Sequence, residues 1–169
     1  MKAKNDKVII RELEFDDLPA VFHLGETLFT AGKWPVLYRH WDEYEVLERF
    51  LSDNEYCFVA EREEKIVGFA IGTLIRKSKG SWTYGYLIWL GIDQKFQGKG
   101  IGKNLLNRLT RRLIENGAKM MMVDTASDNT QAIEFFKKKG FDNIDPHVYL
   151  TKNLLDNPYY KTLKKRGVI

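Results

Sequence analysis

The chain has 169 residues, of which 44% are hydrophobic and 30% charged, with a formal net charge of +4. This length suits one domain that buries its own core, and the composition excludes a disordered chain. The single cysteine, Cys57, excludes an internal disulfide and fits a reducing compartment. No apolar run approaches the ~20 residues of a membrane span and the N-terminus has no signal-peptide pattern. We therefore expect a cytoplasmic protein with one domain over residues 1–169, its core at 8–153 and a basic tail at 154–169.

In chain order, the apolar residues of the first half predict a strand, two helices and a hairpin. The strand is expected at 8–13, a helix capped by Asp16 and Asp17 at 18–29, a second helix from Asp42 to about 53–54, and the hairpin strands at 56–61 and 66–75. The second half predicts a strand at 82–92, a helix from Ile101 to a C-cap at Gly117, a strand at 120–126, a helix at 129–139 and a final strand at 148–150. Strands joined by tight turns should pair antiparallel, and the strands on either side of the helix at Ile101 should be parallel.

A glycine-rich turn joins the strand at 82–92 to the helix that begins at Ile101, with the sequence Gln97-Gly98-Lys99-Gly100-Ile101-Gly102. The first amides of a helix have no intrahelical partners and lie at the positive end of its dipole. Glycine has no Cβ, so a bulky anion can approach such amides closely. The turn therefore predicts a cradle for a phosphate or pyrophosphate, although a plain turn between a strand and a helix has the same local pattern.

The spacing of the glycines separates this turn from two common nucleotide-binding loops. A P-loop needs a glycine five residues before the glycine of its Gly-Lys pair, and a Ser or Thr directly after the pair. Here the pair is Gly102-Lys103, and those two positions are Gln97 and Asn104. A dinucleotide-binding fingerprint needs a third glycine where Lys103 stands. The pattern that fits is Gln-x-x-Gly-x-Gly, formed by Gln97, Gly100 and Gly102.

A second motif follows one helix and one strand later, with the sequence Asn129-Thr130-Gln131-Ala132-Ile133-Glu134-Phe135-Phe136-Lys137-Lys138-Lys139-Gly140-Phe141. By itself it predicts a capped amphipathic helix. The two motifs in this order resemble the signatures of the GCN5-related N-acetyltransferase (GNAT) superfamily, over about residues 8–150. The resemblance implies an α/β fold that has a mixed central sheet with helices on both faces. It also implies a splayed wedge between the fourth and fifth strands, which end near Ile92 and Ala126.

The resemblance further implies acetyl-coenzyme A as cosubstrate, bound in this wedge. Carried over by position, the strand end would bind the pantetheine arm, and the glycine turn would bind the pyrophosphate. The second motif would contact the pantetheine side. The residues concerned are Leu90, Gly91, Ile92, Gln97, Gly98, Lys99, Gly100, Ile101, Gly102, Asn129 and Phe136. An amide at the strand end could also polarise the thioester carbonyl. For Asn129, a plain helix N-cap is an equally good interpretation.

The chain departs from the family pattern at Phe136, where many relatives carry a tyrosine that protonates the departing thiolate. Phenylalanine has no proton to give, so the identity of the general acid is left open. Three tyrosines are candidate replacements: Tyr84, Tyr86 and Tyr149. General acid help is typically worth ~10²–10⁴-fold, so its loss weakens activity without excluding it.

The candidate general base is Asp124, five residues before Asn129, where several relatives have a catalytic glutamate. A carboxylate in an apolar strand is costly unless it faces a cleft or is hydrogen-bonded. The alternative is therefore a structural aspartate that fixes the adjacent loop. His40 and His147 are further candidates for the base.

The segment at 29–54 should cover the acceptor side of the wedge. Its rings could line a pocket for a small amine or form a hydrophobic lid, and they include Trp34, Tyr38, His40 and Trp41. Its acidic residues either attract a cationic acceptor or stabilise the start of a helix, and they are Asp42, Glu43 and Glu45. We predict an N-acetyltransferase that transfers acetyl from acetyl-coenzyme A to a primary amine of a protein, peptide or small molecule, by direct attack in a ternary complex.

Other functions follow from other features of the sequence. Phe136 favours the main alternative, a catalytically silent acyl-coenzyme A-binding module. Nucleic-acid binding has only the mild positive charge in its favour and no recognition motif, so we expect neither a nucleic-acid nor a membrane partner. The three histidines and one cysteine have no metal-ligand spacing, which predicts no metal site. A homodimer is left open.

Overall fold

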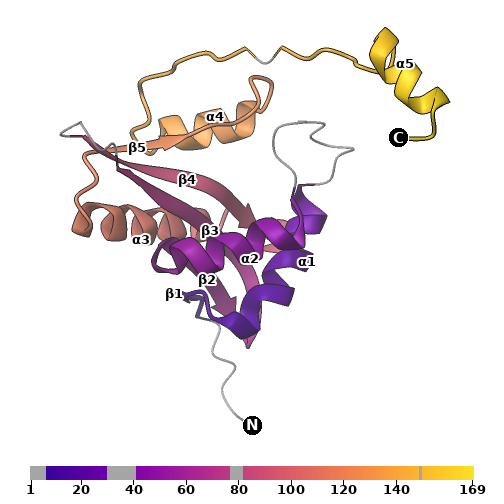
Figure 1. The fold of residues 1–169 in the computed structure, drawn as a ribbon. Helices are drawn as coiled ribbons and strands as arrows, with labels where there is room; N and C mark the ends of the chain where they lie inside the picture. Colours follow the sequence, from indigo (N-terminus) through magenta and orange to yellow (C-terminus); the bar gives the residue numbers. More distant parts are fainter. Residues whose placement is uncertain (1–6, 30–40, 77–81, 149) are drawn as a thin grey trace.

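The computed structural model describes residues 7–29, 41–76, 82–148 and 150–169 (Figure 1). Its strands form one five-stranded sheet in the order β1-β2-β3-β4-β5. They are β1 (Ile9–Glu12), β2 (Cys57–Arg62), β3 (Lys65–Arg76), β4 (Thr83–Ile92) and β5 (Met120–Val123). Strands β1 to β4 pair antiparallel, and β5 pairs parallel with β4 across a helical crossover. This confirms the mixed α/β sheet and the predicted strand directions.

Helices cover both faces of the sheet (Figure 1). On one face lie α1 (Leu18–Leu28) and α2 (Glu43–Asp53), and on the other lies α3 (Ile101–Glu115). The apolar stripe of α3 is fully buried against the sheet, as its helical spacing predicts, and consists of Ile101, Leu105, Leu106, Leu109 and Leu113. A second apolar cluster fills the space beneath α1 and α2 and includes Val21, Val46, Val59, Phe69 and Ile71. Three short 3-10 turns complete the body: Phe15–Asp17, Asn54–Tyr56 and Gln94–Phe96.

A bulge interrupts β4 at the point where β5 separates from it. Ile71 of β3 pairs with Trp89 while the next residue, Gly72, pairs with Leu87, so Ile88 is an extra residue on β4. Pairing between β4 and β5 ends at Leu87 and Val123, immediately before the bulge. A bulge bends its strand and increases the local twist, which accounts for the divergence. The predicted wedge between the fourth and fifth strands therefore begins at Leu87.

The bulge also resets which face of the sheet each side chain occupies. Leu87 and Leu90 belong to the apolar cluster beneath α3. Ile88 and Trp89 are neighbours in sequence, yet both belong to the cluster beneath α1 and α2. In a regular strand successive side chains point to opposite faces, so the extra residue explains this arrangement.

An ion-pair cluster fixes the start of α1. Arg11 donates to both carboxylate oxygens of Asp17, at 2.6 and 2.8 Å, and to Glu61 Oε2 at 2.7 Å. Asp17 is buried and also accepts the Glu14 amide at 2.8 Å. The Arg11 guanidinium holds the pKa of the Asp17 carboxyl below its usual value, because it stabilises the charged form. Asp17 was expected to cap α1, but its side chain makes no cap hydrogen bond there because these other donors use it.

The chain after α4 (Thr130–Lys137) differs from the expectation. A strand was predicted at 148–150, but Val148 and Leu150 are in no strand. The predicted basic tail contains a helix, α5 (Pro158–Lys165), which Asn157 caps by accepting the Tyr159 amide. In Figure 1 this helix stands apart from the sheet and its covering helices. None of the helices in the described part of the chain is both long and apolar enough to span a membrane.

Candidate active site

The glycine-rich turn lies between β4 and α3 and presents open backbone. Gly98 and Gly100 have φ angles of 75° and 81°, in the left-handed region that favours glycine. A Cβ added at either position would meet no atom of the described chain within 4 Å, so the space beside this backbone is open. The Gln97 side chain donates from Nε2 to the Ile92 carbonyl at 3.1 Å and fixes the turn to the end of β4.

The first turn of α3 adds unpaired amides to this open backbone. Gly100 is the N-cap, and no side chain caps the helix there. The Asn104 amide donates to the Gly100 carbonyl at 3.0 Å, so the amides of Ile101, Gly102 and Lys103 precede the hydrogen-bonded part of the helix. The open φ-positive backbone and the positive helix end fit a pyrophosphate, the group predicted for this turn.

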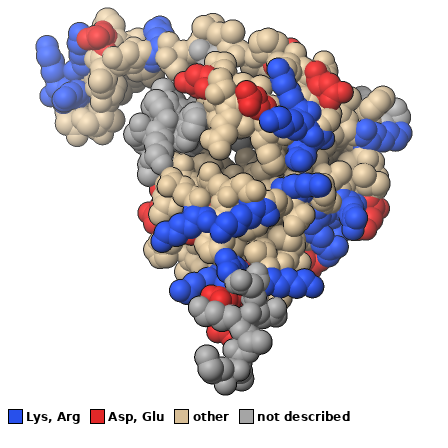
Figure 2. Space-filling view, turned by 180° about the vertical axis from the view of Figure 1, so that it is seen from behind, with Lys and Arg blue, Asp and Glu red and all other residues tan. Residues whose placement is uncertain are grey.

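Basic side chains belong to this part of the chain. Figure 2 shows Lys and Arg side chains in a band across the face opposite to that seen in Figure 1. Lys99 and Lys103 belong to the turn and to the first turn of α3, and the Lys99 ammonium lies 5.1 Å from the Phe96 ring centroid. Their positive charge favours an anionic ligand at the turn.

The end of β4 provides a strand edge beside the turn. Leu90, Gly91 and Ile92 pair with β3 on one side. On the other side the ladder with β5 has already ended at Leu87, so these three residues face no strand of the described chain. An extended ligand can add to such an edge as a further strand, which is the geometry expected for a pantetheine arm.

Gly91 also has a packing role that the sequence did not reveal. A Cβ at this position would lie 2.7 Å from the Phe69 ring and 2.9 Å from Leu28 Cδ1. Contacts this short force a neighbour to move, so the absence of a side chain at Gly91 lets α1 approach β4.

A tyrosine–aspartate pair lies where β4 and β5 separate. The Tyr86 hydroxyl of β4 donates a hydrogen bond to Oδ1 of Asp124, the residue that follows β5. Both side chains are half-buried. The predicted base and one of the proposed replacement acids are thus in direct contact, an arrangement that single-residue reasoning did not reveal. The hydrogen bond also fits the alternative, a structural role for Asp124.

Asn129 caps α4. Its Oδ1 accepts the Ala132 amide at 3.2 Å, and its Nδ2 donates to Thr125 Oγ1 at 3.0 Å. These two bonds support the N-cap interpretation and tie the helix to the loop after Asp124. A contact between Asn129 and a cofactor stays a prediction.

Phe136 lies in the core, with 9% of its surface exposed and its ring against Phe135 and Phe141 at centroid distances of 5.2 and 5.3 Å. The ring beside the glycine turn belongs instead to Phe135, whose Cζ lies 3.6 Å from the position of a Cβ at Gly102. The family resemblance assigned Phe136 to the cofactor, whereas the orientation of α4 brings Phe135 to the turn. A cofactor contact from Phe136 itself stays a prediction.

Trp41 is an anchor of the core beneath α1 and α2. Its ring stacks on Phe69 at 5.1 Å and crosses Trp89 at 5.2 Å, and its indole N–H donates to the Phe22 carbonyl at 2.9 Å. The same ring occupies the space that a side chain at Gly25 would need. Of the aromatic residues predicted for the acceptor side, Trp34, Tyr38 and His40 lie outside the described residues.

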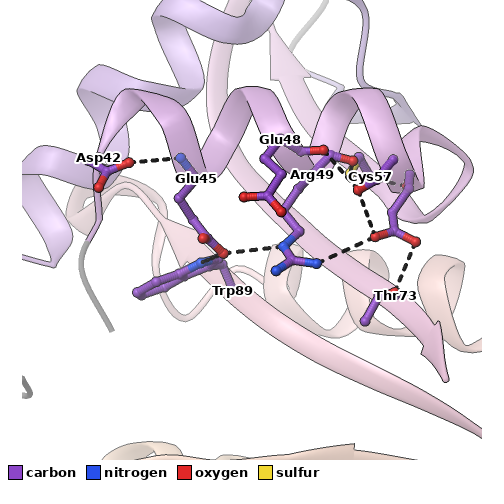
Figure 3. A network of polar contacts seen from close by, with 9 residues as sticks. Asp42, Glu45, Glu48, Arg49, Cys57, Thr73 and Trp89 are labelled. Atoms are coloured by element: carbon purple, nitrogen blue, oxygen red, sulfur yellow. Dashed lines mark hydrogen bonds and ion pairs between the residues drawn. The ribbon is translucent and has the colours of Figure 1, made fainter. Parts of the chain in front are cut away.

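A chain of polar contacts runs along the inner side of α2 (Figure 3). Glu45 Oε1 accepts from Trp89 Nε1 at 3.4 Å and from Arg49 Nε at 3.3 Å. Arg49 continues the chain to Asp53 at 3.6 Å, and Asp53 accepts the Thr73 hydroxyl at 2.9 Å. Figure 3 shows these side chains between α2 and the strands beneath it, so Glu45 places a carboxylate against the bulged part of β4.

Asp42 has a local role in this part of the molecule: its side chain accepts the Glu45 amide at 2.8 Å and caps α2. The helix-start interpretation therefore holds for Asp42, whereas Glu45 contacts β4.

The remaining candidate residues lie elsewhere or are not described. His147 is exposed in the segment that follows α4, with Asp145 at 3.7 Å. Tyr149 lies outside the described residues, as does His40. Within the described ranges, no group of three or more His, Cys, Asp or Glu side chains is arranged to hold a metal ion.

Solved structures share the fold of this chain. An aminoglycoside acetyltransferase from an uncultured soil metagenomic sample, in complex with trehalose, is 24% identical with a TM-score of 0.69, and the match covers 89% of this chain and 100% of that one. AAC(6')-Iy in complex with the bisubstrate analogue CoA-S-monomethyl-acetylneamine is 19% identical with a TM-score of 0.70, covering 87% and 99%. Naa50 of Arabidopsis thaliana in complex with the bisubstrate analogue CoA-Ac-MVNAL is 27% identical with a TM-score of 0.65, covering 82% and 85%.

A family model gives the same result from the sequence. The model of the acetyltransferase (GNAT) family matches residues 19–141, which include the glycine turn, Asp124 and the Asn129 motif. Both predicted motifs thus lie inside the matched region. The chain belongs to the acetyltransferase (GNAT) family.

Proposed function

We propose that the protein transfers the acetyl group of acetyl-coenzyme A to a primary amine in a ternary complex. The observation that carries this proposal is the divergence of β4 and β5 after Leu87 and Val123. It leaves a strand edge at Leu90, Gly91 and Ile92, which leads into the glycine turn. The Tyr86–Asp124 pair stands at its opening.

The binding half of the proposal rests on the backbone. The amides of the glycine turn and of the first turn of α3 hold the pyrophosphate, and the edge of β4 holds the pantetheine arm. Acetyl-coenzyme A supplies an activated acetyl thioester. Solved structures of AAC(6')-Iy and of Naa50 carry coenzyme A or an analogue that contains it, which supports the same cosubstrate here.

The catalytic half rests on Asp124 and Tyr86. A lysine amine with a pKa of ~10.4 is neutral in about one molecule in ~10³ at pH 7, and an α-amine with a pKa of ~7.7–8 in a far larger fraction, so the need for a base depends on the acceptor. Asp124 accepts the proton that the amine loses. The amine nitrogen bonds to the acetyl carbon as the carbon–sulfur bond breaks and coenzyme A leaves as the thiolate. Tyr86 orients the carboxylate through its hydroxyl, gives its phenol proton to the thiolate and regains a proton from Asp124, which had taken it from the amine. Tyr86 of β4 is thus the candidate for the general-acid role that Phe136 cannot fill.

The charge of α2 supports a cationic acceptor. Residues 42–53 contain five carboxylates and one arginine, and the Glu45 carboxylate lies against Trp89 at the bulge. An amine that carries further positive charges would be attracted to this side of the wedge. Neighbouring structures are described with an aminoglycoside, with an acetylneamine conjugate and with a peptide conjugate, so both polyamines and peptide amines belong in the test.

The test is a thiol-release assay with acetyl-coenzyme A and three acceptors: an aminoglycoside, a peptide with a free α-amine, and the same peptide acetylated at its N-terminus. We expect release with at least one free amine and none above background with the blocked peptide. Binding of coenzyme A without any release would favour the silent acyl-coenzyme A-binding module that Phe136 suggests. Failure to bind coenzyme A at millimolar concentration would refute both functions.

A further inference from the structure

The positive charge of the protein is concentrated in its last 18 residues, 152–169, which we call the C-terminal segment. The segment contains five basic residues and one acidic residue, and the difference equals the formal charge of +4 of the whole chain. Residues 1–151 therefore carry no net charge at pH 7. The basic residues are Lys152, Lys161, Lys164, Lys165 and Arg166, and the acidic residue is Asp156. An anionic surface would attract this segment more strongly than the rest of the chain.

Helix α5 separates the apolar side chains of the segment from the basic ones. With ~3.6 residues per turn, Tyr159, Tyr160 and Leu163 lie on one side of the helix. Lys161 and Lys165 lie on the opposite side. A helix with lysines on its polar face and large apolar residues on the other is typical of segments that lie in the interface of a membrane.

The turn at the end of α5 extends its apolar side. The Gly167 amide donates to the Lys164 carbonyl and the Val168 amide donates to the Leu163 carbonyl, both at 3.1 Å. Gly167 has a φ of 68°, so these bonds form a Schellman motif. In this motif the residue after the glycine usually contacts the residue whose carbonyl it binds. Val168 therefore continues the apolar side that includes Leu163.

The C-terminal segment stands apart from the body of the protein. In Figure 1, α5 lies away from the sheet, and in Figure 2 basic side chains gather on this outlying part. Within the described chain, the hydrogen bonds and ion pairs of the segment join its own residues, as in Lys161–Asp156 at 3.3 Å. None of its residues belongs to either apolar cluster of the described chain. Its exposed large apolar residues are Leu154, Leu155, Tyr159, Val168 and Ile169. Apolar side chains gathered in one exposed segment mark a surface that binds a partner.

The combination of positive charge and apolar surface indicates the kind of partner. The phosphates of a nucleic acid would bind the basic residues but would leave aliphatic side chains such as Leu154, Leu155 and Ile169 in water. A membrane with anionic lipids suits both kinds of side chain, because its phosphates lie directly above hydrocarbon. Lysine and tyrosine side chains fit that boundary, since each has an apolar part and a polar end.

We propose that the C-terminal segment binds reversibly to the surface of an anionic phospholipid membrane, with α5 lying in the plane of the interface. Tyr159, Leu163 and Val168 enter the boundary between the headgroups and the acyl chains. Lys164 and Arg166, which flank this side of the helix, reach the lipid phosphates. The sequence predicts no membrane partner, but it also predicts no helix in this segment, and α5 is what places apolar and basic residues on separate sides.

Cosedimentation of the full chain with lipid vesicles tests this attachment. One set of vesicles contains phosphatidylcholine alone, and the other contains equal amounts of phosphatidylcholine and phosphatidylglycerol. We expect binding to the mixed vesicles to be about tenfold or more tighter than to the neutral ones, because only the mixed vesicles attract the basic residues. This binding should weaken as salt is added, since salt screens the attraction. Equal binding to both kinds of vesicle, or binding to neither, would overturn the proposal.

Two triple variants with the same change in charge locate the contact. Lys161→Gln, Lys164→Gln and Lys165→Gln together should weaken binding to the mixed vesicles by about 100-fold, since each basic residue near an anionic surface strengthens binding about fivefold. The control carries the same substitution at the three exposed lysines 137–139 at the end of α4, and it should bind like the parent chain. An equal loss in the two triple variants would assign the binding to overall charge and overturn the proposal.

A variant with unchanged charge tests the apolar side of α5. Tyr159→Ser and Val168→Ser together should weaken binding to the mixed vesicles by about tenfold or more, because these side chains leave the lipid boundary. Both are exposed in the structure, so circular dichroism should show an unchanged fold. The control is Leu51→Ser, at an exposed position of α2, which should bind like the parent chain. Unchanged binding of the double variant would exclude the helix from the interface and overturn the proposal.

Two further measurements separate a membrane from other partners of the segment. Tighter binding to single-stranded polyuridylate than to the mixed vesicles would assign the segment to nucleic acid and overturn the proposal. In sedimentation velocity without lipid, the parent chain and the double serine variant should have the same mass. A mass that falls in the variant would show that another copy of the chain covers this surface, which would also overturn the proposal. None of these readouts depends on acetyl transfer, so their outcome is independent of the proposed function.

Discussion

Tyr86 and Asp124 stand on either side of the point where two strands part. Tyr86 immediately precedes Leu87, the last residue of β4 that pairs with β5, and Asp124 immediately follows Val123, the last residue of β5. The hydrogen bond from the Tyr86 hydroxyl to the Asp124 carboxylate therefore joins the two strands at the end of their ladder. A chemical role and a structural role for this bond predict different outcomes.

Removing either member of the pair should lower acetyl transfer and spare cofactor binding. We expect Tyr86→Phe and Asp124→Asn each to reduce kcat by ~10²–10⁴-fold, the usual worth of general acid–base catalysis. The double variant should cost little more than the worse single variant, because the two groups act as one unit. Thiol release gives kcat and calorimetry gives the coenzyme A affinity. The control is Tyr84→Phe, which alters the tyrosine two residues earlier on β4; full activity in Asp124→Asn would leave the aspartate with a structural role.

The glycine turn can be tested with two substitutions that carry the same backbone strain. Gly100→Val and Gly117→Val both place a side chain at a φ above 80°, and neither new Cβ would meet an atom within 4 Å. Each should lower the free energy of unfolding by ~1–2 kcal/mol, measured by chemical denaturation. Only Gly100→Val should raise the Kd for coenzyme A, by about tenfold or more, because its side chain covers the amides at the start of α3. Equal Kd values for the two variants would remove the turn from the binding site.

The Arg11–Asp17 pair predicts a pH-dependent stability. The pKa of the Asp17 carboxyl in the folded chain lies below the unfolded value of ~3.9. The ionised carboxylate therefore stabilises the fold above pH ~4, and this stabilisation is lost as the pH falls through the folded pKa. Asp17→Asn should therefore lower the free energy of unfolding by ~1.5–3 kcal/mol at pH 7. The difference from the parent chain should shrink toward pH 3. Denaturation at both pH values measures this, with the exposed neighbour in Asp16→Asn as control; a difference that grows on acidification would contradict the assignment.

The only thiol of the protein should be inert in the folded state. Burial raises the pKa of Cys57 to about 12, because the low-dielectric core disfavours the thiolate. Its Sγ contacts the Asp53 carbonyl at 3.5 Å beneath α2. At pH 8 a disulfide reagent should label less than a tenth of the protein within minutes, and one equivalent after unfolding in guanidinium. Rapid labelling of the folded chain would show that α2 opens readily. Slow labelling also means that Cys57 adds no background to a thiol-release assay.

The parts of the site that depend on local sequence could be predicted. The glycine turn, the helix after it and the cap at Asn129 follow from spacing and from the conformational freedom of glycine, which act within a few residues. The stripe on α3, from Ile101 to Leu113, likewise follows from helical periodicity. They predict the glycine backbone with positive φ that the structure has at Gly98 and Gly100.

The parts that depend on distant contacts could not be predicted from the pattern alone. Tyr86 and Asp124 are 38 residues apart, and nothing in the sequence near either one indicates the other. Phe135 and Phe136 are adjacent rings on one helix, so only its rotation decides which one reaches Gly102. Trp41 was predicted to line a pocket or form a lid, but its ring contacts with Phe69 and Trp89 and its hydrogen bond to the Phe22 carbonyl anchor it in the core. The strand predicted at 148–150 was wrong, because a strand needs a partner edge and Val148 and Leu150 pair with none in the described chain.

The extra residue in β4 has a consequence for how the gene can change. Deleting Ile88 would restore regular alternation and leave the side chains on both sides of the deletion on their present faces, because Tyr86 and Trp89 already lie toward α1 and α2. The strand would lose the bend and the extra twist that accompany the bulge, and with them the divergence of β4 from β5. A one-codon loss here would therefore close the wedge while the core stays packed, whereas substitutions that keep the extra residue would keep the wedge. Among descendants of this sequence, the length of the segment between Tyr86 and Gly98 should vary less than the identities of its residues.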